Sequence, residues 1–354
     1  MAARIYLDHA STTPILPEAA EAIRRALDAW ANPSAAHAEG RAVRAAMEEA
    51  RGRIAAALEW EGSLIFTSGA TEAIDIAIRR AKAGDRVVSA VEHMAVLRAA
   101  PDARRVAAKP DGAIDLDDLD AALAGAERPL VAVQSVNNET GVVHPLDEVA
   151  ARTRAAGGLL LGDCAQSAGK LPLPDADFVV AAAHKLGGPP GIAVLLVKDA
   201  ARLEAVGGQE GGHRPGTIAV PLIMGFAAAL EADHGWFEGT KRLRERLDAG
   251  IVAAGGEVVA ASAPRIATIG GYRMPGVPAA AQMMQLDLAG IAVSAGSACS
   301  SGSLKTSHVL LAMGMDEEAA REVIRVSFGP GTDASHVDAL IGEWRKLYER
   351  RRAA

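Results

Sequence analysis

The strongest constraint on the fold of this chain is an alternation of short apolar runs with helical stretches between residues 63 and 197. The apolar runs, each of strand length, lie at 63–69, 85–90, 129–136, 158–163, 177–183 and 191–197. Between them, residues 71–81, 116–124 and 146–156 show apolar positions at helical spacing. Strands that are apolar on both faces and separated by helices predict a mostly parallel sheet between two helix layers.

The segments on either side of this region indicate a second, smaller unit. Helical spacing also covers 17–30 and 38–59, and a long helical stretch begins at Pro221. Shorter elements follow, with strands predicted at 257–262, 265–271 and 291–294 and helices at 279–289 and 335–351. We therefore predict an α/β protein with a large domain over residues 15–255, joined by a long helix to a small α+β domain formed by 1–14 and 256–354.

Charge and hydropathy exclude several functions. The chain has 37 lysine and arginine residues against 44 acidic ones, a net charge of −7, and no basic run in its interior. It therefore lacks the electrostatic signature of a protein that binds nucleic acid or an anionic membrane. No segment approaches the roughly 20 apolar residues of a membrane span, and the first residues lack the apolar core of a signal peptide. We expect a cytoplasmic protein.

The two cysteines stand in different surroundings and indicate neither a disulfide framework nor a metal cluster. Cys164 follows an apolar strand, so we predict a buried packing residue. Cys299 lies in SAGSACSSGS, residues 294–303, where no large side chain is available to bury it. By itself this run is typical of an exposed linker with an incidental cysteine, although glycine and serine would also allow a reactive thiol to move.

Polar side chains follow several of the predicted strands, where open parallel sheets bind their ligands. Residues 68–71 join a strand to a helix through small side chains, which suits phosphate binding, although a capped turn would have the same sequence. Asn137 and Asn138 follow another strand and offer neutral hydrogen-bond partners. His93 follows a third strand, where it could stack on an aromatic cofactor or serve a structural role.

Asp163 and Lys185 give the more specific signal. Asp163, with Gln166 close behind it, follows an apolar strand, where a carboxylate favours a cationic partner such as a protonated pyridine nitrogen. Lys185 follows the next strand beside His184, where loss of water would lower its pKa and favour Schiff-base formation. A helix-capping aspartate and a solvent-facing lysine are the simpler alternatives. Together, the two strand ends have the order expected of an aspartate-aminotransferase-like enzyme of fold type I, which uses pyridoxal 5'-phosphate (PLP).

The chain resembles the NifS/IscS-like cysteine desulfurases of the class V aminotransferase family, from Tyr6 to the final helix. The resemblance rests on a series of ordered motifs: YLDHASTTP, NPSAAHAEGR, IFTSGATEA, VEHMAVL, VNNETG, GDCAQSAGK, AHKLGGPPGI, GGQEGGHRPGT, SAGSACSSG, SHVLLAMG and IRVSFG. It implies a PLP enzyme that converts L-cysteine to L-alanine and transfers the sulfur to Cys299 as a persulfide. The implied partners are a second copy of the chain, in a homodimer, and a sulfur-acceptor protein of iron–sulfur cluster assembly or a similar process.

The resemblance also implies roles for single residues. Lys185 would hold PLP and move the substrate Cα proton, with Cys299 and His93 as the other catalytic groups. The cofactor would be held by Lys185, Ala70, Thr71, His93, Asn138, Asp163, Gln166, His184 and, from the neighbouring subunit, Thr217. Arg325, with Asn32 and Asn138, would bind the substrate, since a guanidinium fork matches a carboxylate.

Some positions depart from the pattern of the family. Ala182 stands where a phosphate-binding serine is usual, which removes one hydrogen bond to the phosphate. The other departures are His9 for asparagine, Ser11 for alanine, Pro215 for serine and Cys164 for alanine. Two alternatives stay open: a selenocysteine lyase or another class V aminotransferase, and a PLP-free paralogue that binds a scaffold protein.

Overall fold

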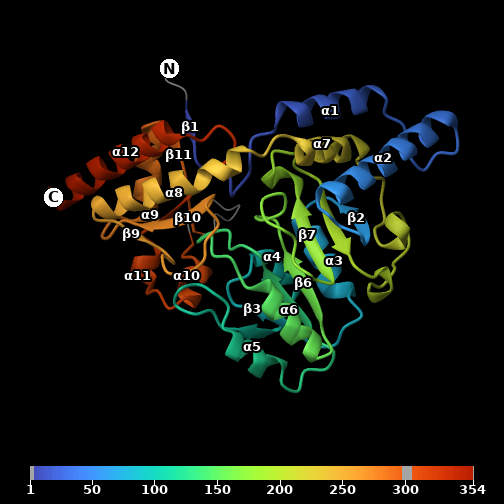
Figure 1. Cartoon of the computed structure of the whole chain (residues 1–354), viewed down its shortest axis with the longest axis horizontal. Coiled ribbons are helices and arrows are strands. Elements are labelled where there is room, and N and C mark those ends of the chain that lie inside the picture. The colour runs from blue at the N-terminus through green and yellow to red at the C-terminus, as the bar shows by residue number, and fades with distance from the viewer. Residues whose placement is uncertain (1–3, 297–304, 354) are drawn as a thin grey trace.

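A computed structural model describes residues 4–296 and 305–353, and a seven-stranded sheet forms its centre (Figure 1). The strand order is β2-β8-β7-β6-β5-β3-β4. These strands are β2 (Ser63–Thr67), β3 (Arg86–Ser89), β4 (Arg104–Val106), β5 (Leu130–Gln134), β6 (Leu159–Asp163), β7 (Phe178–Ala182) and β8 (Ala193–Val197). Strand β8 runs antiparallel to both of its neighbours, whereas the other pairs are parallel. The predicted α/β fold with a mostly parallel sheet is confirmed.

Side chains alternate along the strands, and helices therefore cover both faces of the sheet. Within β7, Val179 and Ala181 join one hydrophobic core, while Phe178 and Val180 join another on the opposite face. The first core is closed by α2 (Ala38–Ala57), α5 (Leu116–Leu123), α6 (Leu146–Ala155) and α7 (Val220–Glu231), with α1 (Pro17–Asp28) packed on α7. The second core is closed by α3 (Ala70–Arg80) and α4 (Met94–Ala99).

A smaller body is built from the two ends of the chain (Figure 1). Its antiparallel sheet has the order β12-β13-β10-β9, and β1 (Ile5–Tyr6) pairs with β11 (Ile291–Ala292). Its other elements are α8 (Trp236–Ala253), β9 (Glu257–Val258), β10 (Ile269–Arg273), α9 (Ala279–Leu288), β12 (Ser294–Ala295), α10 (His308–Ala312), α11 (Glu317–Ala320), β13 (Val323–Ser327) and α12 (Ala334–Ala353). Buried Tyr272 and Trp344 lie in its core together with Leu7 from the N-terminal segment.

The predicted long helix after Pro221 is wrong, because the chain breaks into α7 and α8 at residues 232–235. Asp233 Oδ1 accepts the N–H of Gly235 (2.8 Å), a side-chain turn that competes with helix formation. The predicted strand 291–294 is also divided, between β11 and β12. The domain division at residue 255 stays a prediction. Helix α8, which ends just before this residue, packs on α12 of the smaller body.

Several short elements were not predicted from the sequence. They are β1, β4, α4, α10, α11 and β13, each six residues long or less. Elements this short show too few periods of an apolar pattern to be recognised.

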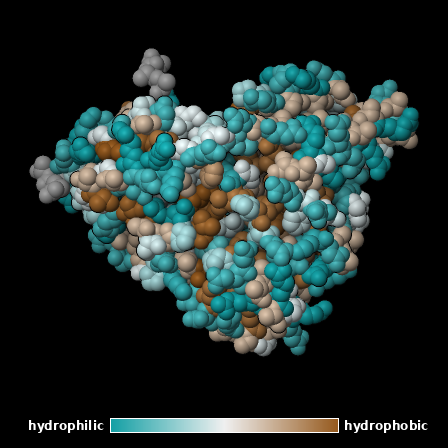
Figure 2. Space-filling view, viewed as in Figure 1, coloured by the Kyte–Doolittle hydropathy of each residue, from teal (hydrophilic) through white to brown (hydrophobic). Residues whose placement is uncertain are grey.

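The described helices include none that is long and apolar enough to cross a membrane. Most of the face seen in Figure 2 is hydrophilic, and hydrophobic residues gather most clearly near its middle, where the two bodies meet.

Candidate active site

A cleft of about 650 Å³ opens where the parallel strands end and the two bodies meet. It is lined by the turns that follow β2, β3, β5, β6 and β7, by residues 10 and 11, and by β13. Of the residues predicted from the sequence, it brings together Ala70, Thr71, His93, Asn138, Asp163, Gln166, His184, Lys185 and Arg325. Side chains that are far apart in the sequence thus meet at the carboxyl edge of the sheet.

Three predicted site residues are not among those that line the cleft. Asn32 and Thr217 are exposed, and neither lines the cleft of its own chain. Asn32 therefore does not share this space with Arg325 within one subunit. Cys299 belongs to the segment 297–304, which lies outside the described residues.

The turn into α3 is one wall of the cleft. Helix α3 begins after Gly69, and none of the described side chains caps its first turn. A Cβ added to Gly69 would have no heavy atom within 4 Å, so the space at the helix start is open. Ala70 and Thr71 present backbone N–H groups in this first turn, which favours an anion such as a phosphate.

Asp163 ends β6, and its carboxylate is buried at the cleft. Its Oδ1 accepts the N–H of Ala165 (2.9 Å). Burial raises the pKa of Asp163, although the hydrogen bond from Ala165 and the charges of His93 and Lys185 oppose the rise. A buried carboxylate of this kind is stabilised most by a cationic partner, and a protonated pyridine nitrogen would be one.

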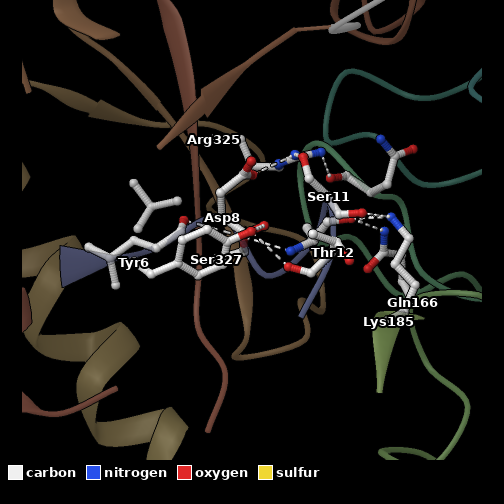
Figure 3. Close-up of polar contacts among 12 residues, drawn as sticks. Tyr6, Asp8, Ser11, Thr12, Gln166, Lys185, Arg325 and Ser327 are labelled. Atoms are coloured by element: carbon white, nitrogen blue, oxygen red, sulfur yellow. Dashed lines mark hydrogen bonds and ion pairs between the residues drawn. The ribbon is translucent and has the colours of Figure 1, made fainter. Parts of the chain in front are cut away.

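Lys185 lies at the end of a short 3-10 helix, η1 (Ala183–Lys185), directly after β7. Its Nζ donates to the carbonyl oxygens of Ala10 and Ser11, the second at 2.9 Å (Figure 3). Burial, followed by the charges of Arg325 and Lys170, lowers the pKa of Lys185 to about 7. A large fraction of this amine is therefore neutral near pH 7, and the neutral amine is the form that attacks a carbonyl.

Gln166 and Lys170 fix the chain around this lysine. Gln166 Nε2 donates to the carbonyl of Ala10 (2.9 Å), which also accepts from Lys185. Lys170 Nζ donates to the carbonyls of Gln166 (3.2 Å) and Lys185 (3.4 Å). Burial lowers the pKa of Lys170 to about 8.

His93 and His184 are neutral histidines on the cleft wall. His93 caps α4 by accepting the N–H of Ala95 at Nδ1 (3.2 Å), so the neutral ring carries its proton on Nε2. Burial lowers the pKa of His93, and it lowers that of His184 to about 4. His184 Nδ1 lies 3.2 Å from Thr12 Oγ1.

Arg325 brings a cation to the cleft from the smaller body. Its Nη2 donates to Asp8 Oδ1 (2.9 Å) and to Ser11 Oγ (2.7 Å), and its Nη1 donates to the carbonyl of Asn138 (3.0 Å). The side chain is only 8% exposed. Nε of Arg325 is buried without a hydrogen-bond partner among the described residues, so the guanidinium can still donate to a bound carboxylate.

The sequence analysis missed several residues of the cleft. They are Asp8, Ala10, Ser11, Gln134, Glu139 and His308. Figure 3 shows the N-terminal segment with Asp8 and Ser11 lying between Arg325 and Lys185. The motif YLDHASTTP contains the first three of them, so it was the signal that could have identified them. Ser11, a departure from the family pattern, gives Arg325 an acceptor.

Two buried glutamates, one through its carboxylate and one through its backbone carbonyl, tie the chain after residue 304 to the strand ends. Glu139 accepts a hydrogen bond from Ser307 Oγ, and the carbonyl of Glu92 accepts one from His308 Nε2 (2.9 Å). Burial raises the pKa of both glutamates, that of Glu92 well above its usual value. Since Gly296 and His308 both line the cleft, the described chain reaches it on each side of segment 297–304.

The structure explains some of the other positions at which the sequence departs from the family pattern. Cys164 is fully buried, and burial raises its pKa to about 12, which confirms the predicted packing role. His9 packs edge-on against Tyr6, with ring centroids 5.0 Å apart. A Cβ on Gly329 would lie 2.0 Å from His9 Nδ1, so the histidine needs a glycine there. Ala182 ends β7 and is buried.

The chemistry of these donors fits PLP. The uncapped start of α3 suits the phosphate, Asp163 suits the ring nitrogen, and the neutral amine of Lys185 suits the aldehyde.

Comparison with known proteins agrees with this fit. Residues 5–340 match the Aminotransferase class-V family. The chain is 35% identical to a cysteine desulfurase of Cereibacter sphaeroides over 99% of this chain and 97% of that protein. A solved NifS-like protein from Rickettsia africae ESF-5 has a TM-score of 0.90 and 30% identity, and covers 98% of this chain and 99% of its own. The structure of SspA in complex with cysteine has a TM-score of 0.80 and 28% identity, and the match covers 92% of this chain and 99% of SspA. The chain therefore belongs to the class-V aminotransferase family of PLP enzymes and, within it, to the NifS/IscS-like cysteine desulfurases.

Proposed function

We propose that this cysteine desulfurase converts L-cysteine to L-alanine in the strand-end cleft and passes the sulfur to Cys299 as a persulfide. The observation that carries the proposal is the cleft itself, in which Lys185, Asp163 and Arg325 surround one space. Gly296 and His308, the described lining residues on either side of the segment that contains Cys299, belong to the same cleft.

Bound PLP supplies an electron sink for negative charge at the substrate Cα. Lys185 Nζ would hold the cofactor and then carry the Cα proton, for which its lowered pKa is suited. Asp163 would pair with the ring nitrogen and keep it protonated. His93 would stack on the ring and exchange protons through Nε2, while Gln166 would donate to the ring oxygen.

The phosphate would lie at the start of α3. Ala70 and Thr71 would donate their backbone N–H groups to it, and the exposed hydroxyl of Thr71 and the imidazole of His184 would add side-chain contacts. Ala182 offers no donor, so the neighbouring contacts must hold the phosphate without it.

Arg325 would bind the carboxylate of L-cysteine. Asp8 and Ser11 hold its Nη2 group in place, and the backbone of Asn138 holds Nη1, so the guanidinium is oriented before the substrate arrives. Asn138 also lines this cleft, and its side-chain amide would donate to the substrate or the ring oxygen.

The sulfur transfer needs a thiolate at Cys299. Its sulfur would attack the substrate sulfur, so that an S–S bond forms while the Cβ–S bond breaks. The electron pair left on the substrate carbon would take up a proton and give alanine. The persulfide would then deliver sulfur to an acceptor protein, and iron–sulfur cluster assembly is the use that we propose.

We also propose a cytoplasmic homodimer in which Thr217 contacts the phosphate of the neighbouring subunit. Thr217 is exposed and does not line the cleft of its own chain, which supports action in trans. Asn32 is exposed as well, and nearby Ser34 accepts a hydrogen bond from Gln209 (2.9 Å), on the loop that leads to Thr217. Asn32 would therefore reach substrate in the neighbouring subunit.

Substitution of the two cysteines tests the proposal. Cys299→Ser should keep the yellow colour of bound PLP but lower sulfide release from L-cysteine by roughly a hundredfold or more, because the nucleophile is gone. Cys164→Ala is the matched control and should keep both properties, since that thiol is buried with a pKa of about 12. Lys185→Ala should lose both the Schiff-base absorbance and the activity.

Two results would contradict the proposed reaction. Sulfide release by Cys299→Ser at the wild-type rate would exclude the persulfide step. A keto acid in place of alanine as the product of L-cysteine would identify an aminotransferase instead.

A further inference from the structure

The chain between β8 and α7 folds into a tight hairpin over residues 206–217. The backbone N–H groups of Val206 and Gly207 both donate to the carbonyl of Gly212 (2.8 and 3.0 Å), and Gln209 pairs with Arg214 across the hairpin. A short 3-10 helix, η3 (Glu210–Gly212), forms the tip. Thr217 lies three residues after Arg214, so the contacts that hold the hairpin limit where that threonine can lie.

A buried ion pair anchors the tip of the hairpin to the central sheet. Glu210 accepts two hydrogen bonds from Arg51 of α2, at 2.8 and 2.9 Å, and its side chain is 1% exposed. Glu210 also accepts the N–H of Phe66 in β2 (2.7 Å). Arg51 in turn donates to the carbonyl of Leu64 (2.7 Å) and stacks over the ring of Phe66 at 4.4 Å. Strand β2 and helix α2 (Figure 1) therefore hold Glu210 through three hydrogen bonds from two residues.

The backbone at Glu210 shows how strongly the contacts hold it. Its φ of 54° is left-handed, a conformation that a residue with a side chain adopts only at a cost. A network of fixed donors must offset that cost. Such a conformation persists only where the surrounding structure fixes the residue.

Further contacts link the hairpin to the turn at the start of α3. Arg214 Nε pairs with Glu72 Oε1 (3.0 Å), and the same carboxylate accepts the N–H of Ser68, which lines the cleft. Arg80 of α3 donates to the carbonyl of His213 (3.0 Å). The hairpin is thus attached to β2 and α3, the two elements joined by the turn at the proposed phosphate site of its own subunit.

We infer that Arg51 and Glu210 are positioning residues that fix the hairpin so that Thr217 can complete the cofactor site of the neighbouring subunit. This inference rests on the homodimer of the proposed function. Stability alone is a weak reason for such a pair, since replacing a buried ion pair by apolar residues often costs nothing. A bidentate ion pair does, however, fix the position of the hairpin in one geometry. A contact between Thr217 and the neighbouring subunit requires such a fixed position.

Cofactor binding to the apo protein tests the role of the pair. Glu210→Gln should raise the Kd of PLP, measured by absorbance titration, about tenfold while the protein stays dimeric by sedimentation velocity. Thr217→Ala should raise this Kd by a similar factor. The variant that carries both changes should have the same Kd as Thr217→Ala alone, because both changes remove the same contact. Glu48→Gln is the matched control. Glu48 also accepts a hydrogen bond from Arg51, but its side chain is 51% exposed, so the Kd of PLP should stay within about twofold of the wild-type value.

Subunit mixing separates action in trans from a local effect. In a mixed dimer of Lys185→Ala and Glu210→Gln subunits, one site combines an intact Lys185 with an intact hairpin from the other chain. That site should bind PLP with the wild-type Kd and show the Schiff-base absorbance. If the wild type is a dimer but the mixed dimers do not recover PLP binding, the positioning inference is overturned while the proposed homodimer stands. A monomeric wild type would overturn the proposed homodimer and the inference with it.

Discussion

At the scale of single residues, burial sets the proton state of Lys185. The pKa of this amine falls from that of an ordinary lysine to about 7, first through loss of water and then through Arg325 and Lys170, although Asp163 and Asp8 act in the opposite direction. The apo protein therefore holds an amine that can react near neutral pH without a separate base.

The rate of PLP uptake should follow this pKa. In the apo protein, we expect the rate of Schiff-base formation to rise with pH through about 7 and to level off above about 8, because Lys185 loses its proton in that range. His93 and His184 have lowered pKa values, so they are already neutral there. Stopped-flow absorbance measures the rate, and PLP with a simple alkylamine in solution corrects for titration of PLP itself. A rate that still rises at pH 10 would show an ordinary lysine.

Ser11 should affect substrate binding more than catalysis. Ser11→Ala removes one of the acceptors that hold Arg325, while Asp8 and Asn138 keep the others. Loss of one such hydrogen bond costs on the order of 1 kcal/mol, so KM for L-cysteine should rise about threefold to tenfold with kcat nearly unchanged. Steady-state kinetics at saturating PLP measure both constants. A large fall in kcat at constant KM would place Ser11 in the chemical step instead.

The residues that the sequence predicted and those it missed differ in how they reach the cleft. Asp163 and Lys185 follow buried strands, and the parallel arrangement places their side chains at one edge. Asp8 and Ser11 follow no helical or strand period of useful length. They reach the cleft because β1 pairs with β11 and Asp8 forms a bridge to Ser327, contacts between residues about three hundred positions apart. No local pattern encodes such contacts.

At the scale of elements, six of the seven strands of the large sheet were predictable from the sequence, but the antiparallel direction of β8 was not predicted. The run from β7 to β8 leaves only residues 183–192 as a connection. Two neighbouring parallel strands need a crossover of a dozen or more residues, so a connection this short forces β8 to run antiparallel. The break between α7 and α8 was missed for another reason: Asp233 and Gly235 form a turn that only a search for side-chain turns would have identified.

Two glycines of helix α8 offer a sharp test of how it packs on α12. A Cβ on Gly250 would lie 2.4 Å from Cδ1 of Ile341, whereas a Cβ on Gly239 would meet no heavy atom within 4 Å. Gly250→Ala should lower the free energy of unfolding by about 1–2 kcal/mol, because overpacking outweighs the gain in helix propensity. Gly239→Ala should raise it by about 0.5–1 kcal/mol, since only the propensity changes.

Urea denaturation of both variants measures these changes. Combining Gly250→Ala with Ile341→Ala should give a smaller loss than the sum of the single changes, because the added methyl group then occupies vacated space. Equal stabilisation by both glycine substitutions would show that the two helices do not pack this closely.

At the scale of the whole molecule, the cleft exists only where the two bodies meet. Lys185 and Asp163 come from the large sheet, Arg325 comes from β13, and the N-terminal segment lies between them. Composition and periodicity predicted two units but not their shared surface, and the family resemblance was needed to connect Arg325 with the strand ends. Asn32 and Thr217 lie away from this cleft, and in the proposed homodimer they would extend the same principle to two copies of the chain.

The proposed dimer makes cofactor binding and subunit association linked equilibria. If Thr217 contributes a phosphate contact in trans, PLP must tighten the dimer by the same factor by which dimerisation tightens PLP binding. We expect PLP to lower the dissociation constant of the dimer by about tenfold for each site, the effect of one hydrogen bond to a charged group. Sedimentation velocity over a dilution series, with and without PLP, measures the shift. Thr217→Ala should abolish it and Thr217→Ser, which keeps the hydroxyl, should retain it. A dissociation constant that PLP leaves unchanged would contradict the contact in trans, because a ligand held by both subunits cannot bind without drawing them together.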